Sequence, residues 1–234
     1  MVQCVILAGG LATRLRPISE SIPKALVSVG DRPFADLQLR WLSAQGVRDV
    51  LYCVGNLGEQ IIDFVGTGQQ WQLNVAYCDE GRNLRGTGGA LRLALDRNLL
   101  QSRFLVLYGD TYLDISVPRV IETFNRSRLP ALMTVLANSG QWDTSNADFR
   151  DGLVRYNKED PTPNWSYIDY GLLAFQRSAI ATIPPNRRFD LAQLLQVLGS
   201  LGQLAGFEAT RRFYEIGSVA GLQELSLHLK TGEA

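Results

Sequence analysis

The feature that most constrains the fold of this chain is its alternation of short apolar runs with amphipathic helical stretches. The apolar runs have the character of strands and lie at residues 2–8, 49–54, 73–77, 104–107 and 131–136. Between them, apolar side chains recur at helical spacing in residues 34–44, 58–65, 87–99 and 115–126. Strands that alternate with helices predict βαβ units. We therefore expect an α/β fold with a Rossmann-like, mostly parallel sheet flanked by helices.

The pattern changes after Ala137. Residues 138–151 are polar and are expected to form a loop. The apolar runs at 153–156 and 168–175 predict further strands, and residues 190–198 and 218–229 predict two terminal helices. No internal repeat, charge block or linker separates the two parts, so we expect one continuous domain over residues 1–234, whose second part is the smaller portion.

Length and charge narrow the classes of function. The 234 residues suffice for one large domain that needs neither a metal nor a disulfide to fold. The 23 basic and 23 acidic side chains balance, which argues against a nucleic acid or a membrane surface as partner. No apolar run approaches the ~18–20 residues of a membrane span, and the N-terminal run lacks the basic segment of a signal peptide. We expect a cytoplasmic protein.

The cysteines and the single histidine exclude other kinds of site. Cys4, Cys53 and Cys78 lie in apolar runs and match no zinc-binding spacing, so we expect buried, reduced thiols. His228 is the only histidine, which excludes a histidine-rich metal site and argues against a Ser-His-Asp triad.

The first apolar run ends in a glycine-rich turn, and basic residues follow it closely. The residues concerned are Leu7, Ala8, Gly9 and Gly10, then Arg14, Arg16 and Lys24. Glycines let a backbone approach a ligand, and N–H groups that no helix or sheet uses suit an anion. Three cations nearby favour a polyphosphate. The turn fits neither the dinucleotide fingerprint nor the P-loop. We expect a nucleoside triphosphate here, with a purely structural turn as the alternative.

The motif L-A-G-G-x-x-T-R-L-x-P at residues 7–17, followed by Pro23-Lys24, resembles the signature of sugar-1-phosphate nucleotidyltransferases, also called nucleotide-sugar pyrophosphorylases. The resemblance continues along nearly the whole chain, at residues 55–57, 85–91, 108–110, 157–159, 168–171 and 214–218. The short length and the segment G-T-G-G-A-L at 86–91 are most similar to bacterial heptose- or hexose-1-phosphate guanylyltransferases.

The resemblance implies a reaction and two substrates. A nucleotidyl group would pass from a nucleoside triphosphate to a sugar 1-phosphate, giving an NDP-sugar and pyrophosphate with Mg²⁺ as cofactor. The favoured pair is GTP with a heptose- or mannose-type 1-phosphate. Residues 1–110 would form the nucleotide-binding half and residues 111–234 the sugar-phosphate-binding half. Such in-line transfers need positioning and charge neutralisation more than a protein nucleophile.

The resemblance assigns the motif residues of the first half to the nucleotide. The expected catalytic residues are Arg14, Lys24 and Asp110. The expected nucleotide contacts are Leu7, Ala8, Gly9, Gly10, Thr13, Gly86, Thr87, Gly88 and Gly89. Asp110 follows a strongly apolar strand, where parallel sheets bind ligands. Thr87 is also a candidate N-cap of the following helix, and Glu80 a candidate acceptor for a base or ribose.

On the acceptor side, the sugar phosphate is expected to contact Gly109, Lys158, Asp169 and Gly171. The expected ligands of Mg²⁺ are Asp110 and Glu215. Three positions depart from the family pattern: Glu215 replaces the usual aspartate, Asn157 an often-found glutamate, and Ala12 a common glycine.

Other functions stay open at this point. A uridylyl- or thymidylyltransferase acting on another phosphorylated acceptor is one. A non-catalytic homologue that senses sugar nucleotides is another; the three departures favour it, whereas the intact Arg14, Lys24, Asp110 and Lys158 argue against it. The apolar positions of 218–229 fit either core packing or a homo-oligomer interface, core being the default.

Overall fold

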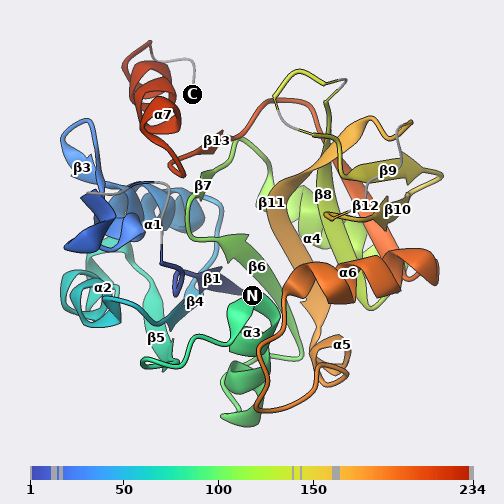
Figure 1. Cartoon of the computed structure of the whole chain (residues 1–234), viewed down its shortest axis with the longest axis horizontal. Coiled ribbons are helices and arrows are strands. Elements are labelled where there is room, and N and C mark those ends of the chain that lie inside the picture. Colours follow the sequence, from blue (N-terminus) through green and yellow to red (C-terminus); the bar gives the residue numbers. More distant parts are fainter. Residues whose placement is uncertain are drawn as a thin grey trace. The chain divides into compact units, whose positions relative to one another are not determined.

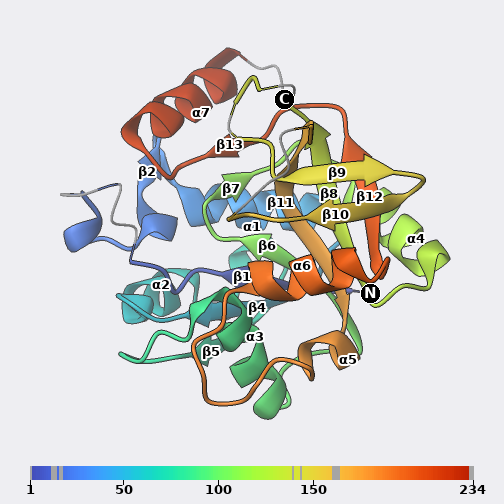
Figure 2. The same ribbon diagram turned by 45° about the vertical axis from the view of Figure 1, so that its right-hand side comes forward.

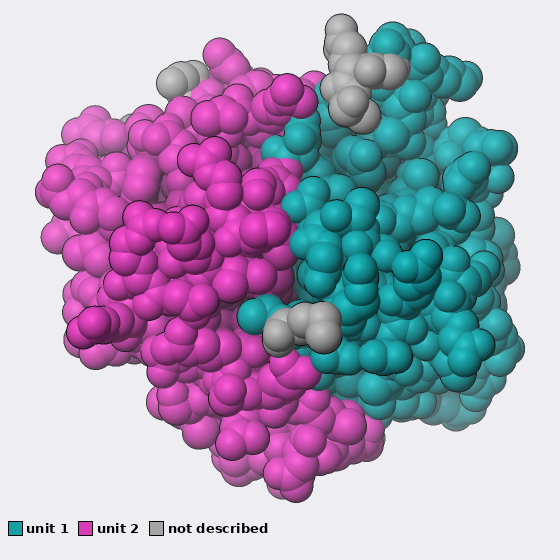
Figure 3. Space-filling view, turned by 180° about the vertical axis from the view of Figure 1, so that it is seen from behind, with its two compact units in different colours: residues 1–84, 107–114, 213–234 teal, residues 85–106, 115–212 magenta. Residues whose placement is uncertain are grey.

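A computed structural model of the chain describes residues 2–11, 15, 18–138, 140–142, 144–159 and 164–231. It divides into two compact units, which Figure 3 colours separately. Unit 1 comprises residues 1–84, 107–114 and 213–234, and unit 2 comprises residues 85–106 and 115–212. Within the described ranges, no helix combines the length and the apolar character needed to cross a membrane.

Unit 1 is built on three parallel strands formed by the apolar runs near the N-terminus. They lie in the order β5 (Asn74–Asp79), β4 (Asp49–Val54), β1 (Gln3–Leu7). The register pairs Leu7 with Cys53 and Cys53 with Cys78, so the three carboxyl ends lie at one edge of the sheet. Two helices join these strands, α1 (Phe34–Ala44) and α2 (Gly58–Val65) (Figure 1).

Smaller elements complete unit 1, and they bring the two ends of the chain together. They are β2 (Ser28–Val29), β3 (Arg32–Pro33), β7 (Thr111–Tyr112), β13 (Tyr214–Glu215), α7 (Val219–Thr231) and short 3-10 turns at Ile18–Glu20, Lys24–Leu26 and Gln69–Trp71. Ile216 and Leu225 near the C-terminus pack in one buried cluster with Val29 and Phe34. Figure 1 accordingly shows α7, in red, beside the blue N-terminal elements.

Unit 2 holds a mixed sheet. Its strands follow the order β6 (Arg103–Tyr108), β11 (Tyr167–Gln176), β8 (Ala131–Ala137), β12 (Leu204–Ala209), β10 (Leu153–Tyr156), β9 (Ala147–Arg150). β8 and β12 are parallel, whereas β8 with β11 and β10 with its neighbours are antiparallel. The helices are α3 (Gly86–Asp96), α4 (Val117–Ser127), α5 (Arg177–Ile180) and α6 (Leu191–Ser200). α4 packs against β8 and β12, and α6 against β10 and β12 (Figure 2).

The expected α/β fold is confirmed, and so are the principal predicted elements, with α1, α2, β4 and β10 at the predicted bounds. The prediction that residues 138–151 form only a loop is wrong, because β9 occupies 147–150 and pairs with β10. No strand was predicted at β12, whose sequence contains a glycine and a glutamate. A Cβ atom at Gly206 would lie 2.3 Å from the Phe149 ring, so a larger residue would displace this ring.

Candidate active site

The turn after β1, where the sequence predicts an anion, presents backbone N–H groups beside a carboxylate. The N–H of Ala8 donates to Cys53 O at 2.9 Å, which continues the sheet by one residue. The N–H groups of Gly9 and Gly10 have no acceptor among the residues that the structure describes. A Cβ atom at Gly9 would lie 2.9 Å from Oε1 of Glu80, so this carboxylate lies directly against the turn. The turn thus offers two backbone donors, with Glu80 at its side.

Lys24 and Asp110, far apart in the sequence, meet in unit 1. Lys24 Nζ lies 2.5 Å from Asp110 Oδ2, and the two side chains are 18% and 26% exposed. Pro23 has an extended conformation and precedes the 3-10 turn that carries Lys24. The carbonyl oxygen of Pro23 accepts a hydrogen bond from Leu26 N–H at 2.8 Å. Both side chains are partly buried, so their electrostatic attraction is stronger than that of a solvated surface pair. Two residues predicted to be catalytic are therefore in direct contact.

The turn that carries Asp110 is held against the end of β1. Gly109 N–H donates to Leu7 O at 3.0 Å, and Ile216 N–H donates to Asp110 O at 2.9 Å. A Cβ atom at residue 109 would lie 2.6 Å from Leu7 O and 3.2 Å from the Ala8 Cα, so only glycine allows this approach. Gly109 was predicted from the sequence as a sugar-phosphate contact, which the structure does not test. What it displays is the close backbone approach that brings Asp110 to the carboxyl edge of β1.

The donor set near Asp110 fits a divalent metal that is shared with substrate phosphates. Asp110 Oδ2 contacts Lys24, while Oδ1 lies 3.4 Å from the Thr111 hydroxyl. Thr111, the residue after Asp110, pairs with Glu215 between β7 and β13. Glu215 is exposed. Mg²⁺ in nucleotide sites typically takes one or two carboxylates together with phosphate oxygens and water. In the described part of the chain, no three His, Cys, Asp or Glu side chains gather as a metal site.

In unit 2, the glycine-rich start of α3 packs on the backbone of Phe189. The N–H groups of Gly88 and Gly89 both donate to Phe189 O, at 2.9 and 3.1 Å. A Cβ atom at Gly86 would lie 2.8 Å from the same oxygen. The N–H groups of Gly88 and Gly89 are therefore used within the protein. That these glycines contact a nucleotide stays a prediction. Such a contact would depend on the nucleotide lying close to their backbone, not on hydrogen bonds from the N–H groups of Gly88 and Gly89.

Thr87 is not the N-cap of α3, contrary to the expectation, because α3 begins at Gly86 with Arg85 in the capping position. The Thr87 hydroxyl instead donates to Asp190 Oδ1 at 3.0 Å and accepts from Leu191 N–H at 2.8 Å. Asp190 is itself the N-cap of α6 and accepts from Ala192 N–H at 3.0 Å. Lys158 Nζ lies 3.7 Å from Asp190 Oδ2. Two predicted site residues therefore share one carboxylate.

The environment of Asp190 favours its charged form. Burial alone would raise the pKa of the carboxyl group, but the Ala192 N–H, the Lys158 charge and the Thr87 hydroxyl outweigh it and lower the pKa. Sequence reasoning did not single out this residue. An aspartate just before an amphipathic helix was the available signal.

Asp169 and Gly171 form an irregular turn within β11. Asp169 Oδ1 accepts from the N–H of Gly171 at 3.0 Å, and Gly171 has φ of +101°, which disfavours any other residue. Asn146 holds this segment: its side chain accepts from Asp169 N–H, its N–H donates to Tyr167 O, and its carbonyl accepts from Asn157 N–H, each at 3.0 Å. Asn146 was missed from the sequence, where it stands in a polar stretch without periodicity.

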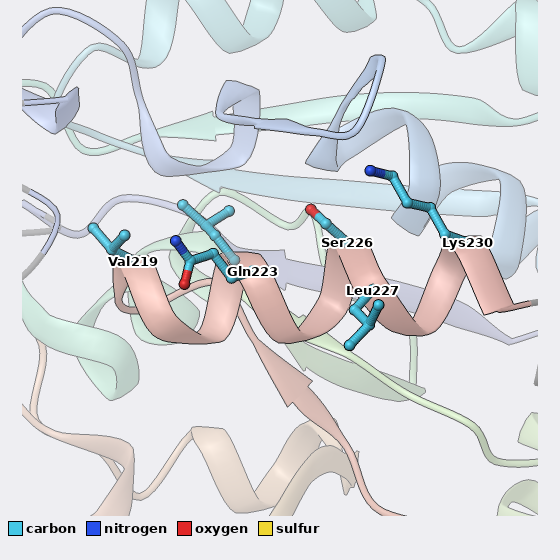
Figure 4. A pocket seen from close by; sticks show the side chains of 6 residues that line it. Val219, Gln223, Ser226, Leu227 and Lys230 are labelled. Atoms are coloured by element: carbon cyan, nitrogen blue, oxygen red, sulfur yellow. The ribbon is translucent and has the colours of Figure 1, made fainter.

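Thr13 and Arg14, predicted at the nucleotide, lie outside the described residues, as do Ala12 and Arg16. The expected buried thiols are confirmed, because Cys4, Cys53 and Cys78 are free and buried. A hollow along α7 is lined by Val219, Leu222, Gln223, Ser226, Leu227 and Lys230 (Figure 4). It includes none of the predicted site residues.

The sequence of this chain is similar to those of known nucleotidyltransferases. A family model described as "Nucleotidyl transferase" matches residues 3–146. The D-glycero-alpha-D-manno-heptose 1-phosphate guanylyltransferase of Campylobacter jejuni is 26% identical over 195 residues, which cover 83% of this chain and 85% of that protein. The glucose-1-phosphate thymidylyltransferase of Streptomyces antibioticus is 27% identical over 196 residues, covering 81% of this chain but 54% of that protein. The chain thus spans about half the length of this second relative.

Solved structures agree. HddC from Yersinia pseudotuberculosis, in complex with GMP-PN, has a TM-score of 0.81 and 25% identity, covering 98% of this chain and 100% of that one. The relatives and the fold are those of sugar-1-phosphate nucleotidyltransferases, and the Rossmann-like fold is confirmed. The substrates of such enzymes are a nucleoside triphosphate and a sugar 1-phosphate, and they typically use a divalent metal ion.

Proposed function

Because this chain belongs to the nucleotidyl transferase family, we propose that it transfers a nucleotidyl group from a nucleoside triphosphate to a sugar 1-phosphate. An oxygen of the sugar phosphate attacks the α-phosphorus and forms the new P–O bond. The bond from that phosphorus to the oxygen bridging to the β-phosphate breaks, and pyrophosphate leaves on the opposite side. The observation that carries the proposal is the Lys24–Asp110 pair at the turn beside the end of β1.

Within unit 1, each part of this arrangement has a task in the reaction. The N–H groups of Gly9 and Gly10 donate to phosphate oxygens of the triphosphate. Lys24 neutralises charge where two anions meet, which is the main requirement of such transfers. Arg14, which the family motif assigns to the triphosphate, would stabilise the departing pyrophosphate. No step needs a nucleophile from the protein.

Asp110 and Glu215 would hold the divalent metal, which we propose is Mg²⁺. When bound, Mg²⁺ neutralises phosphate charge and aligns the triphosphate for in-line attack. Hydrogen bonds to Leu7 and Ile216 hold the backbone around Asp110, and Lys24 contacts its carboxylate. Glu215 is the second ligand, with a side chain one methylene longer than the family's usual aspartate.

Unit 2 supplies the proposed contacts of the sugar phosphate. Lys158 is 60% exposed and carries the charge that would pair with the phosphate. Gly171, whose φ of +101° disfavours other residues, has no side chain and would leave room for the sugar ring. Asp169, whose Oδ1 accepts from Gly171 N–H, is the carboxylate that would accept from a sugar hydroxyl. The Gly86–Gly89 segment would contribute backbone surface to the nucleotide.

For the base and the sugar we propose guanine and a heptose- or mannose-type acceptor. The name of the Campylobacter jejuni relative and the GMP-PN complex of the Yersinia protein support this choice. Glu80 supports it independently. Its carboxylate lies against Gly9, and guanine presents two adjacent donors, N1–H and N2–H₂, that a carboxylate accepts together. We place the reaction in the cytoplasm, where nucleoside triphosphates are available.

The test is pyrophosphate release with Mg²⁺, using the four ribonucleoside triphosphates and dTTP against a panel of hexose and heptose 1-phosphates. Release with GTP and a heptose or mannose 1-phosphate is the expected result. Release only with UTP or dTTP overturns the base assignment and keeps the reaction class. Nucleotide binding without release across the whole panel, including phosphorylated non-sugar acceptors, overturns catalysis in favour of a sensing homologue.

A further inference from the structure

A polar residue lies on the buried face of α1, where apolar side chains surround it. Gln38 is 1% exposed and shares this face with Phe34, Leu39 and Leu42, which are fully buried. Burying a primary amide costs free energy unless hydrogen bonds replace the lost water. A leucine or methionine would fill this position without that cost. Packing alone therefore does not account for Gln38.

The side-chain amide of Gln38 bridges the turn that carries Asp110. Its nitrogen Nε2 donates to Tyr108 O at 3.1 Å and to Thr111 O at 3.0 Å. These carbonyls flank Gly109 and Asp110, one at the end of β6 and one at the start of β7. The reversed amide orientation would place an oxygen against two carbonyls, so the hydrogen-bond network defines the orientation.

The carbonyl oxygen of the same side chain has no such role. Gln38 Oε1 is buried and accepts no hydrogen bond from any group in the described ranges of the chain. An unpaired buried acceptor destabilises the folded state. The residue therefore contributes through its two N–H donors, and both of them act on the Asp110 turn.

Other contacts fix the turn from its remaining sides. Gly109 N–H bonds to Leu7 O, and Ile216 N–H bonds to Asp110 O. The bonds from Gln38 are the ones that tie both flanks of the turn to a helix. Without them, Tyr108 O and Thr111 O lose their hydrogen bonds to α1, and the backbone on the α1 side of the turn is released. The Asp110 carboxylate would then no longer be presented to Lys24 in one orientation.

We propose that Gln38 is a positioning residue for nucleotidyl transfer: by bridging Tyr108 O and Thr111 O, it fixes the Asp110 carboxylate for metal and substrate. It touches neither substrate. The inference rests on the proposed function, since it takes Asp110 to be a metal ligand. A purely structural role is the competing explanation, and it affects stability without changing metal dependence or pH dependence.

The first test compares Gln38→Met with Gln176→Met. Both changes remove a glutamine amide that donates to a backbone carbonyl, but Gln176 bonds to Leu129 O in unit 2, whereas Asp110 belongs to unit 1. We expect Gln38→Met to lower kcat at least about tenfold and to raise the Mg²⁺ concentration for half-maximal rate several-fold. Gln176→Met is expected to change neither. Wild-type kcat and metal dependence in a folded Gln38→Met protein would falsify the proposal.

The second test uses Gln38→Glu and the pH profile. Burial raises the pKa of a carboxyl group, and only its protonated form can donate a hydrogen bond to a carbonyl. We therefore expect the activity of Gln38→Glu, relative to wild type, to fall between about pH 6 and about pH 8.5 as this group ionises. A constant ratio to wild type across that range overturns the proposal, and this test decides the matter if Gln38→Met does not fold.

A third measurement does not depend on turnover. Mn²⁺ affinity of the nucleotide-free protein, followed by electron paramagnetic resonance, is expected to weaken several-fold in Gln38→Met but not in Gln176→Met. Equal affinities overturn the positioning role. If wild type releases no pyrophosphate on any acceptor, the proposed function fails, while the Mn²⁺ comparison still tests whether Gln38 positions Asp110.

Discussion

At the scale of single residues, the proposed chemistry centres on the Lys24–Asp110 pair. The two side chains are 2.5 Å apart and belong to segments that the sequence separates by 86 positions. Lys24→Met removes the cation that we propose neutralises the reacting phosphates, and Asp110→Asn removes a carboxylate that we propose as a metal ligand. We expect each to lower kcat by about 10²–10³-fold in a pyrophosphate-release assay. Because the two side chains contact each other, we expect the kcat of the double variant to lie only slightly below that of the less active single variant.

Lys230→Met is the matched control for these variants. Lys230 is an exposed lysine on α7, outside the predicted site. It is expected to keep wild-type kcat. Thermal unfolding of all variants separates loss of chemistry from loss of fold. A wild-type kcat in either Lys24→Met or Asp110→Asn would contradict the roles assigned to the pair.

Glu80 is predicted to determine the base. Glu80→Gln replaces one of the two carboxylate acceptors by a donor, which faces the donor edge of guanine. We expect kcat/KM for GTP to fall by about 10- to 100-fold, with a much smaller change for UTP. Asp79→Asn, which changes the neighbouring exposed carboxylate, is the control. An equal loss for GTP and UTP would show that Glu80 acts on a group common to both nucleotides.

At the scale of elements, the sequence predicted best where apolar periodicity is strong. α1, α2 and β4 were predicted at their observed bounds because buried side chains recur at regular spacing. β7 and β13 were not predicted, since two-residue strands have no period to detect. Asp110 directly precedes β7 and Glu215 lies in β13. The sequence therefore indicated both proposed metal ligands but not their geometry.

The N-terminus of α6 provides a prediction with a pH dependence. Asp190 caps this helix, and its lowered pKa means that the folded state favours the carboxylate. The stabilisation is present above the ordinary pKa of 3.8 and is lost as pH falls through the lower, folded-state value. We expect Asp190→Ala to lower the free energy of unfolding by about 1 kcal/mol at neutral pH, and Asp190→Asn to lower it less.

Chemical denaturation at several pH values checks this expectation. Gln196→Ala, at an exposed position of the same helix, is the control and is expected to change stability by at most about 0.5 kcal/mol. The difference between wild type and Asp190→Ala should shrink as the pH falls below the ordinary carboxyl pKa. A difference that stays constant into strong acid would show that the charge of Asp190 does not contribute.

At the scale of the whole molecule, the limit on sequence reasoning is the assembly of units from separate segments. Unit 1 combines residues 1–84, 107–114 and 213–234, and no local pattern indicates which segments join. The apolar positions of α7 illustrate this. Leu225 and Leu227 are the same residue type, two positions apart, yet they are 0% and 64% exposed. Only the packing against Val29 and Phe34 distinguishes them.

The last prediction compares Leu225→Ala with Leu227→Ala. Helix propensity changes equally in the two variants, so a difference between them reports packing. Leu225→Ala opens a cavity in the cluster that includes Ile216, so we expect it to cost about 2–5 kcal/mol of unfolding free energy. It should also lower kcat, since Ile216 N–H bonds to Asp110 O. Leu227→Ala is expected to cost at most about 0.5 kcal/mol, measured by denaturant unfolding. A large loss in Leu227→Ala that grows with protein concentration would instead mean that the hollow on α7 in Figure 4 is covered by a second copy of the chain.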